Sequence, residues 1–364
     1  MDNKLSLDHL SLRGAMAILL VVYISGCNVY GHAMGMASDR WIAAAIGLVV
    51  AAPLFLILAR LICLLPGMNL FDMLEYAFGR VLGALITVLY CVYFIAMAAL
   101  AGRYHGAFLH LTTLPNTPLI VLLLVVFAVC IYLAKSGAIT LGKWSVLIAI
   151  LAVLFAVGMT VVALPAMRLN HLLPLGVHGG QGLLWGGYRS AVLILGNAII
   201  FLALAGRLDK KANPYGLFFF SAALAVVFFA LTFLRDLATL GQGSMDTVFF
   251  PAYKAAGVLD LGGLGIRIES FVLLIALLTG ITKIAVCLVA AANGATRIGG
   301  RLDRKVLLFL VTAMALILAM GLFPNLTSLF AFPSVYLRYA PVLQMGIPVL
   351  MWLIVEGKVK KRSP

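Results

Sequence analysis

The sequence predicts an all-α membrane protein with about ten transmembrane helices, and three observations support this fold class. Hydrophobic residues make up 64% of the chain, charged residues only 10%, and the mean hydropathy is +1.14. A spanning helix needs roughly 20 mainly apolar residues, and about ten such runs are present. Two of these runs are interrupted by glycine and polar residues at corresponding places. We therefore expect one polytopic membrane domain over residues 1–364.

The expected spans follow the apolar runs in order. They are 12–34, 41–64, 81–101, 118–135, 144–165, 186–206, 214–234, 267–292, 305–323 and 341–356. Division into two sets of five gives repeat one at about 12–165 and repeat two at about 186–356. In a five-plus-five inverted repeat of the LeuT type, the first and sixth spans hold equivalent positions, and breaks in both mark the ligand site.

The first span contains a polar stretch, Ser25-Gly26-Cys27-Asn28-Val29-Tyr30-Gly31. At bilayer depth, non-helical backbone is tolerated only where protein or a wet cavity satisfies its amide and carbonyl groups. Glycine leaves helical geometry at little cost. We expect an unwound segment here, and the residues expected to contact a small ligand are Ser25, Gly26, Cys27, Asn28, Tyr30 and Gly31. Close helix packing through the two glycines is the alternative.

Short helices are expected in two connections. Residues 70–79 form an amphipathic pattern, with apolar residues for the membrane interface and Asp72 and Glu75 for water. Residues 247–254 are expected to form a short helix over the outer vestibule. In the third span, Tyr90 and Tyr93 share a helix face, and Tyr93 is a candidate wall of the site. Ordinary packing between helices is the alternative for either tyrosine.

The sixth span carries the second interruption, at Leu195-Gly196-Asn197. Half-helix ends at such a break direct positive dipole ends toward an anionic group, and freed carbonyls receive a cation. A free amino acid carries both charges, so we include these three residues in the ligand site. As in the first span, helix packing by the glycine and an interhelical bond by the asparagine are the alternative.

The eighth span places a charged residue, Lys283, inside the membrane, with Thr279 one turn earlier. A charge near the bilayer centre costs about 2.5–3.5 kcal/mol and needs a partner or a wet cavity. Snorkelling to the inner interface is the alternative, but that interface is far for one side chain. We expect Lys283 to hold unwound carbonyls of the first span in place of a coupling cation. Glu269 is a gate candidate, paired with Arg267 or Arg235.

Charge and cysteine usage exclude several classes. The net charge of +14 is explained by basic residues in cytoplasmic loops rather than by a nucleic-acid partner. This bias predicts both termini in the cytoplasm. The five cysteines lie in apolar runs without metal-ligand spacing, so we expect no metal and no cofactor. A membrane-embedded enzyme would need paired carboxylates or an activated nucleophile, and the spans contain neither.

The chain resembles the B subunit of spore-germination receptors (GerAB type). The most specific marks are Pro251-Ala252-Tyr253-Lys254 after span seven and Arg267-Ile268-Glu269-Ser270-Phe271 opening span eight. That family is similar to amino acid–polyamine–organocation transporters. The resemblance implies a nutrient sensor in the inner membrane of a dormant spore, with a membrane A subunit and a lipoprotein C subunit as partners.

Two functions therefore stay open. In the first, an L-amino acid or similar nutrient binds between spans one, three, six and eight, and partner subunits respond to the resulting shift of helices. In the second, the chain is a proton-coupled amino acid permease of the same fold, which needs no partner subunits.

Overall fold

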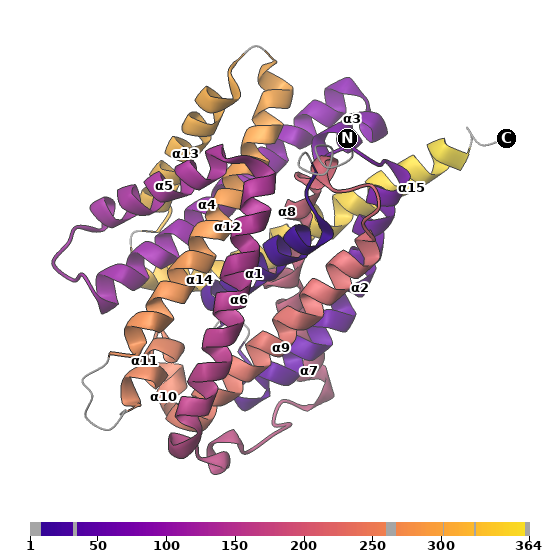
Figure 1. Cartoon of the computed structure of the whole chain (residues 1–364). Coiled ribbons are helices and arrows are strands. Elements are labelled where there is room, and N and C mark those ends of the chain that lie inside the picture. Colours follow the sequence, from indigo (N-terminus) through magenta and orange to yellow (C-terminus); the bar gives the residue numbers. More distant parts are fainter. Residues whose placement is uncertain (1–8, 32–34, 260–266, 301, 324, 361–364) are drawn as a thin grey trace, which may run out of the picture.

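The computed structural model describes residues 9–31, 35–259, 267–300, 302–323 and 325–360, and these residues are almost entirely helical (Figure 1). Nine helical segments are long and apolar enough to cross a membrane, and the 17-residue apolar helix α5 brings the number in this part of the chain to ten. The helices are α1 (Leu12–Tyr30), α2 (Arg40–Leu64), α3 (Leu70–Phe78), α4 (Arg80–Thr112), α5 (Leu119–Lys135), α6 (Gly137–Ala163), α7 (Gly179–Leu193), α8 (Ile199–Leu202), α9 (Pro214–Leu240), α10 (Gln242–Thr247), α11 (Pro251–Val258), α12 (Glu269–Gly299), α13 (Arg304–Gly321), α14 (Leu326–Pro341) and α15 (Ile347–Lys360).

Short irregular elements connect them. The 3₁₀ segments are η3 (Ala37–Asp39), η4 (Leu164–Ala166), η5 (Leu169–Leu172), η6 (Leu195–Ala198) and η7 (Ala205–Arg207), and η8 (Val342–Gly346) is a π-helix. Helices α14 and α15 form one span through η8, so the last crossing begins earlier than the sequence suggests. Helix α4 also continues to Thr112, through part of the expected outer connection. The expected short helix near residue 250 is present as α11.

Helix α3 confirms the amphipathic helix, but its apolar face does not lie in the membrane interface. Leu70, Phe71 and Leu74 are fully buried, because α3 packs against α4 and α15. Its carboxylates instead pair with Arg297 at the end of α12, at 2.5 Å from Glu75 and 3.5 Å from Asp72. The apolar face of α3 therefore packs on the bundle, and its carboxylates stay partly exposed at this end of the protein.

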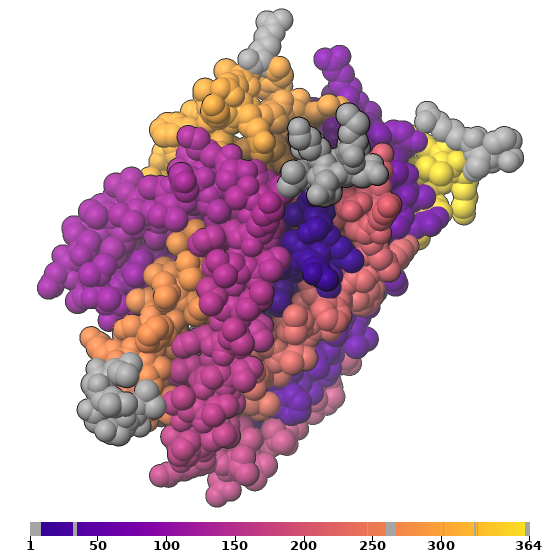
Figure 2. All heavy atoms as spheres, in the orientation of Figure 1, coloured from indigo at the N-terminus to yellow at the C-terminus, as the bar shows by residue number. Residues whose placement is uncertain are grey.

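Three spans form the inside of the bundle. In α1, α7–α8 and α12, 72% of the residues in the most apolar window are buried, against 22–50% in the other spans that meet the length criterion. Figure 2 shows α6 covering the centre of one face and leaving one end of α1 in view. Large apolar side chains are exposed on the outer helices, as with Leu154 of α6 and Ile317 of α13. Such side chains suit a lipid-facing surface.

The sixth span is broken as predicted. Helix α7 ends at Leu193, η6 follows as a 3₁₀ turn, and α8 resumes at Ile199. The Asn197 amide nitrogen donates to the carbonyls of Leu193 and Ile194, both at 2.9 Å. The break therefore satisfies part of its own backbone with the asparagine side chain.

The first span requires a correction. Ser25 to Tyr30 is regular α-helix, and the amide of Gly31 still donates to the carbonyl of Cys27. Glycine permits a departure from helical geometry but does not impose one, and the helical bonds along this stretch are kept. Residues 32–34 of the predicted span lie outside the described residues. Helix α1 ends at Tyr30, and Gly35, Met36 and Ala37 have left-handed backbone angles.

The segment before α1 is bound to the middle of the chain. The amide of Leu10 donates to the carbonyl of Arg207 at 2.7 Å, and the carbonyl of Leu10 accepts from the amide of Asp209 at 3.1 Å. These bonds form a parallel bridge between Leu10 and Leu208. The Leu10 side chain is 1% exposed and contacts the Gly14–Gly142 crossing of α1 and α6. The start of the first span is thus fixed to the connection between α8 and α9.

Candidate functional site

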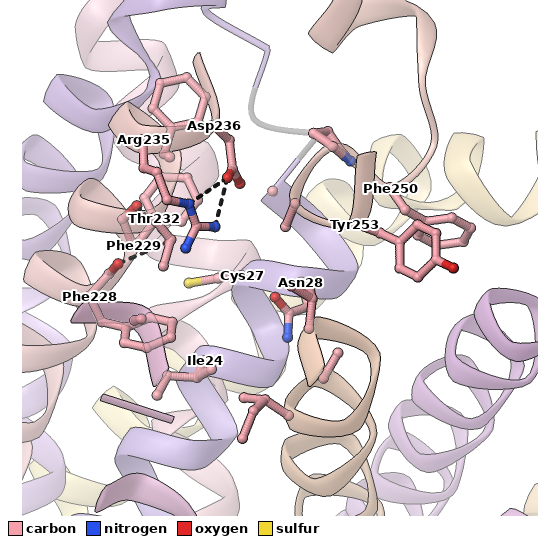
Figure 3. A pocket seen from close by; sticks show the side chains of 18 of the residues that line it. Ile24, Cys27, Asn28, Phe228, Phe229, Thr232, Arg235, Asp236, Phe250 and Tyr253 are labelled. Carbon is pink, nitrogen blue, oxygen red and sulfur yellow. Dashed lines mark hydrogen bonds and ion pairs between the residues drawn. The ribbon is translucent and has the colours of Figure 1, made fainter. Parts of the chain in front are cut away.

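A pocket opens at the C-terminal end of α1, on the side of the bundle where α10 and α11 lie (Figures 1 and 3). Its cavity measures about 130 Å³, roughly ten times the volume that one water molecule needs. Ile24, Cys27, Asn28 and Gly31 supply the α1 wall, and residues of α2, α4, α6, α9, α10, α11 and α12, with Phe250 before α11, supply the remaining walls. The end of the first span therefore lines an open space, although it does so as a helix.

Most of the pocket wall is aromatic. Phe229 and Phe233 of α9 stack on each other with ring centroids 5.7 Å apart. On another wall, Phe250 stacks on Phe108 of α4 at 4.4 Å and contacts Tyr104 edge-on. Phe250 directly precedes α11, so these contacts attach the α10–α11 segment to α4. The segment closes one side of the pocket with apolar surface.

The charged part of the pocket is an ion pair of adjacent residues, Arg235 and Asp236 of α9. Nε and Nη2 of Arg235 both donate to Oδ1 of Asp236, at 2.8 and 2.6 Å. The two side chains are only 5% and 7% exposed. Figure 3 shows the guanidinium reaching from α9 toward Cys27. A buried pair of this kind is an unusual feature in an otherwise apolar wall.

A second cation, Arg40, lies at the pocket but is held by the protein. Its Nε donates to the carbonyl of Gly35 at 2.9 Å, and its guanidinium lies 5.1 Å from the centroid of Phe233. It therefore supports the left-handed turn after α1. The next residue back, Asp39, is fully buried and accepts from the Gly176 amide at 2.6 Å and from His178 Nδ1 at 3.1 Å. These bonds attach the loop before α7 to the start of α2.

A second set of predicted residues lies in a buried polar network next to the α1 wall. The Tyr93 and Tyr336 hydroxyls are 2.7 Å apart, and Gln344 Nε2 lies 3.1 and 2.8 Å from them. The same Nε2 donates to the Val192 carbonyl at 3.1 Å, at the end of α7. Gly196 leaves room for this amide, since a Cβ at that position would overlap Gln344. The 3₁₀ break of the sixth span thus packs against the π-helix of the tenth.

Lys283 is fully buried, as expected, but it does not hold backbone of the first span. Its ammonium lies 5.3 Å from the centroid of the Tyr30 ring and has no hydrogen-bond partner among the described residues. The carbonyls that we expected it to bind remain in α1. Cys27 and Cys287 are its electrostatic neighbours. The contact with Tyr30 is a cation–π interaction.

The remaining predicted residues are dispersed. Thr279 is buried and donates to the carbonyl of Ala276 within its own helix. Ser25 is buried, and its hydroxyl has no hydrogen-bond partner in the described part of the chain. Leu195 and Asn197 pack inside the bundle. Glu269 pairs with Arg267 at 2.8 Å, one of the two partners predicted, and it does not line the pocket.

The structure therefore brings Cys27, Asn28 and Gly31 to the pocket, whereas Tyr93, Gly196 and Lys283 do not line it. Sequence reasoning did not identify Asp236 or the aromatic wall as parts of the site. One available signal was the position of Arg235-Asp236 at the end of a long apolar run, where both charges fall on the same helix. Gln344 was also missed, although a polar residue within a span is a recognised signal.

Comparison with known proteins gives a consistent picture. A family model described as spore germination protein matches residues 14–325. The putative spore germination protein YfkT of Bacillus subtilis (strain 168) is 23% identical over 88% of this chain and 88% of its own length. Spore germination protein B2 of the same organism is 25% identical over 79% of this chain and 78% of its own length.

Solved structures show the fold. Mhp1, a nucleobase-cation-symport-1 family transporter in a closed conformation, matches with a TM-score of 0.68 and 15% identity over 94% of this chain and 78% of that chain. A manganese transporter of Eremococcus coleocola matches with a TM-score of 0.58 and 15% identity over 94% of this chain and 83% of that chain. The chain thus has the LeuT-like fold of these transporters.

Proposed function

This chain belongs to the spore germination protein family, and from that membership we propose that it is the nutrient-sensing membrane subunit of a germination receptor, with an L-amino acid as its ligand. It is an integral membrane protein with a transporter-like fold. Its relatives are germination proteins and its structural neighbours are transporters, so it is not an enzyme.

The observation that carries the proposal is the pocket at the end of α1. Cys27 and Asn28 provide polar groups beside an aromatic wall, in a cavity suited to a small molecule. A ligand shifts the equilibrium between two helix arrangements only to the extent that it binds one arrangement more tightly than the other. In this proposal, the buried residues Tyr93, Gly196 and Lys283 respond to occupancy of the pocket instead of contacting the ligand.

We place the chain in the inner membrane of the spore, with both termini in the cytoplasm and with A and C subunits as partners. The excess of lysine and arginine in the segments on the side of the termini supports this orientation. The family membership supports the location. In this proposal, the partner subunits respond to the change in helix arrangement that nutrient binding causes.

The test fills the pocket with a large side chain. Asn28→Trp is expressed in spores whose only nutrient receptor contains this chain, and germination is followed with a mixture of the twenty standard L-amino acids. We expect the response to fall at least tenfold while the amount of the chain in the spore membrane is unchanged. Leu154→Trp is the control, because that side chain is 64% exposed on α6. An unaltered dose–response curve for Asn28→Trp would contradict the proposal.

A permease is the second candidate, and two observations favour it. The fold is that of transporters, and Lys283 is a buried ionisable side chain inside a span, a position typical of residues on proton pathways. Substrate counterflow in vesicles that contain this chain alone would support a proton-coupled amino acid permease. Absence of counterflow would favour the receptor. Sodium-dependent binding would contradict a role of Lys283 in place of a cation.

A further inference from the structure

The Arg235–Asp236 pair uses only part of its hydrogen-bonding capacity. Both bonds between the side chains end on Oδ1 of Asp236, and they come from Nε and Nη2 of Arg235. Nη1 of Arg235 and Oδ2 of Asp236 form no bond with any residue that the structure describes, and both residues line the pocket. One charged donor and one charged acceptor, on neighbouring residues of the pocket wall, are therefore without a bond to the described residues.

Burial makes this incomplete pairing significant. Two charges removed from water are stabilised by each other only when their remaining donors and acceptors are also satisfied. A ligand that carries a carboxylate and an ammonium would satisfy both. In an α-amino acid these groups are attached to one carbon, so a single small molecule presents both charges to the pair. An anion alone would leave Asp236 without its partner, and a cation alone would be repelled by Arg235.

The surrounding wall determines what the rest of the ligand must be. Phe229 and Phe233 lie on α9 within two turns before the pair, and Phe250 faces the cavity from another wall (Figure 3). The nearby Arg40 is engaged with Gly35 and with the Phe233 ring. The space beside the pair is thus apolar and small, and it suits an uncharged, apolar side chain.

We propose that Arg235 and Asp236 select a zwitterion: Nη1 of Arg235 binds the carboxylate of a free amino acid, Oδ2 of Asp236 binds its ammonium, and its apolar side chain packs on the phenylalanines. The inference rests on the proposed function and specifies the ligand class of the same pocket. It moves the charged recognition to α9, away from the two spans in which the sequence predicted it.

The experiment measures selectivity, because a purely structural role of the pair would not change it. The purified full-length chain in lipid nanodiscs is titrated calorimetrically with each of the twenty standard L-amino acids. The tightest binder is then compared with its amide, which lacks the carboxylate, and with its deamino acid, which lacks the ammonium. We expect both analogues to bind at least tenfold more weakly than the amino acid.

The variants separate the two contacts. Asp236→Asn should lose most of the discrimination against the deamino acid and keep that against the amide, and Arg235→Gln should do the reverse. Each single change leaves one buried charge unpaired, so the double variant Arg235→Gln/Asp236→Asn is included and should lose both discriminations. Arg60→Gln and Glu356→Gln are matched controls, since that ion pair of 2.8 Å lies outside the pocket.

Three results would overturn the inference: equal binding of the analogues by the wild-type chain, unchanged ratios in the variants, or no binding by any of the twenty amino acids. The proposed function is judged separately by the spore response. Loss of that response in Asn28→Trp together with unchanged selectivity ratios would leave the proposed function standing and refute the zwitterion contact alone.

Discussion

The first and sixth spans contain similar interruptions, yet within the residues that the structure describes only the sixth is broken. Both place glycine and asparagine inside an apolar run. In the sixth span, the carbonyls at the end of α7 accept from side chains: Val192 from Gln344, and Leu193 from Asn197. In the first span, the carbonyl of Cys27 keeps its bond with the Gly31 amide. The comparison teaches that glycine allows a break, but donors from elsewhere in the fold decide whether the break persists.

The two glycines also differ in their surroundings. A Cβ at Gly196 would overlap the Gln344 amide, whereas a Cβ at Gly26 would meet Ile194 and Asn197 at 3.7–3.8 Å, which is ordinary contact. The glycine of the sixth span is therefore required by packing against another element. The glycine of the first span is not. Substitutions at these positions test the comparison directly.

The largest effect is expected for Gly196→Ala. The added methyl group must displace Gln344 from the Val192 carbonyl and from the two tyrosine hydroxyls, so we expect a destabilisation of about 3 kcal/mol from overpacking and lost hydrogen bonds. The measurement is the apparent melting temperature in detergent. Gly158→Ala is the control, because nothing lies within 4 Å of a Cβ there. Equal melting temperatures for the two variants would refute the packing argument.

An intermediate effect is expected for Gln344→Ala. The Val192 carbonyl loses a donor, and we expect a cost of about 2 kcal/mol. The double variant Gly196→Ala/Gln344→Ala sharpens the comparison, because the shorter side chain makes room for the new methyl group. Its loss of stability should be clearly smaller than the sum of the single losses. Additive losses would show that the two positions do not share this contact.

The smallest effect is expected for Gly26→Ala. Within a continuous helix, alanine is favoured over glycine by about 0.5–1 kcal/mol, so the melting temperature should stay the same or rise slightly. If the first span were unwound at this position, the same change would instead destabilise the protein. A fall of several degrees in the melting temperature would therefore support the unwound segment that the sequence predicted and contradict the continuous helix.

Much of the fold was accessible from composition and spacing. Apolar runs located the spans, and the glycine–asparagine pair located the break in the sixth span. The burial of Lys283 is predictable, because a charged side chain far from both ends of a span must face the interior of the bundle or a wet cavity. These features depend on the chemistry of the bilayer, which acts on each span separately.

The site was less accessible, because it depends on contacts between distant segments. Asp236 becomes a site residue only when the end of α9 lies beside the end of α1, and Phe250 only when it packs on α4. The continuity of α1 was missed for a related reason. Its sequence shows that a break is possible, but not that the donors needed to maintain one are supplied elsewhere.

The bridge between Leu10 and Leu208 has a consequence for biogenesis. During synthesis, α1 is made about 200 residues before Leu208, the residue that pairs with Leu10 in the folded protein. Until residues 207–209 are made, the segment before α1 lacks the two backbone bonds that hold it in the folded protein. The start of α1 therefore reaches its final position only after the α8–α9 connection has been synthesised. A chain truncated before that connection would lack the backbone bonds of Leu10.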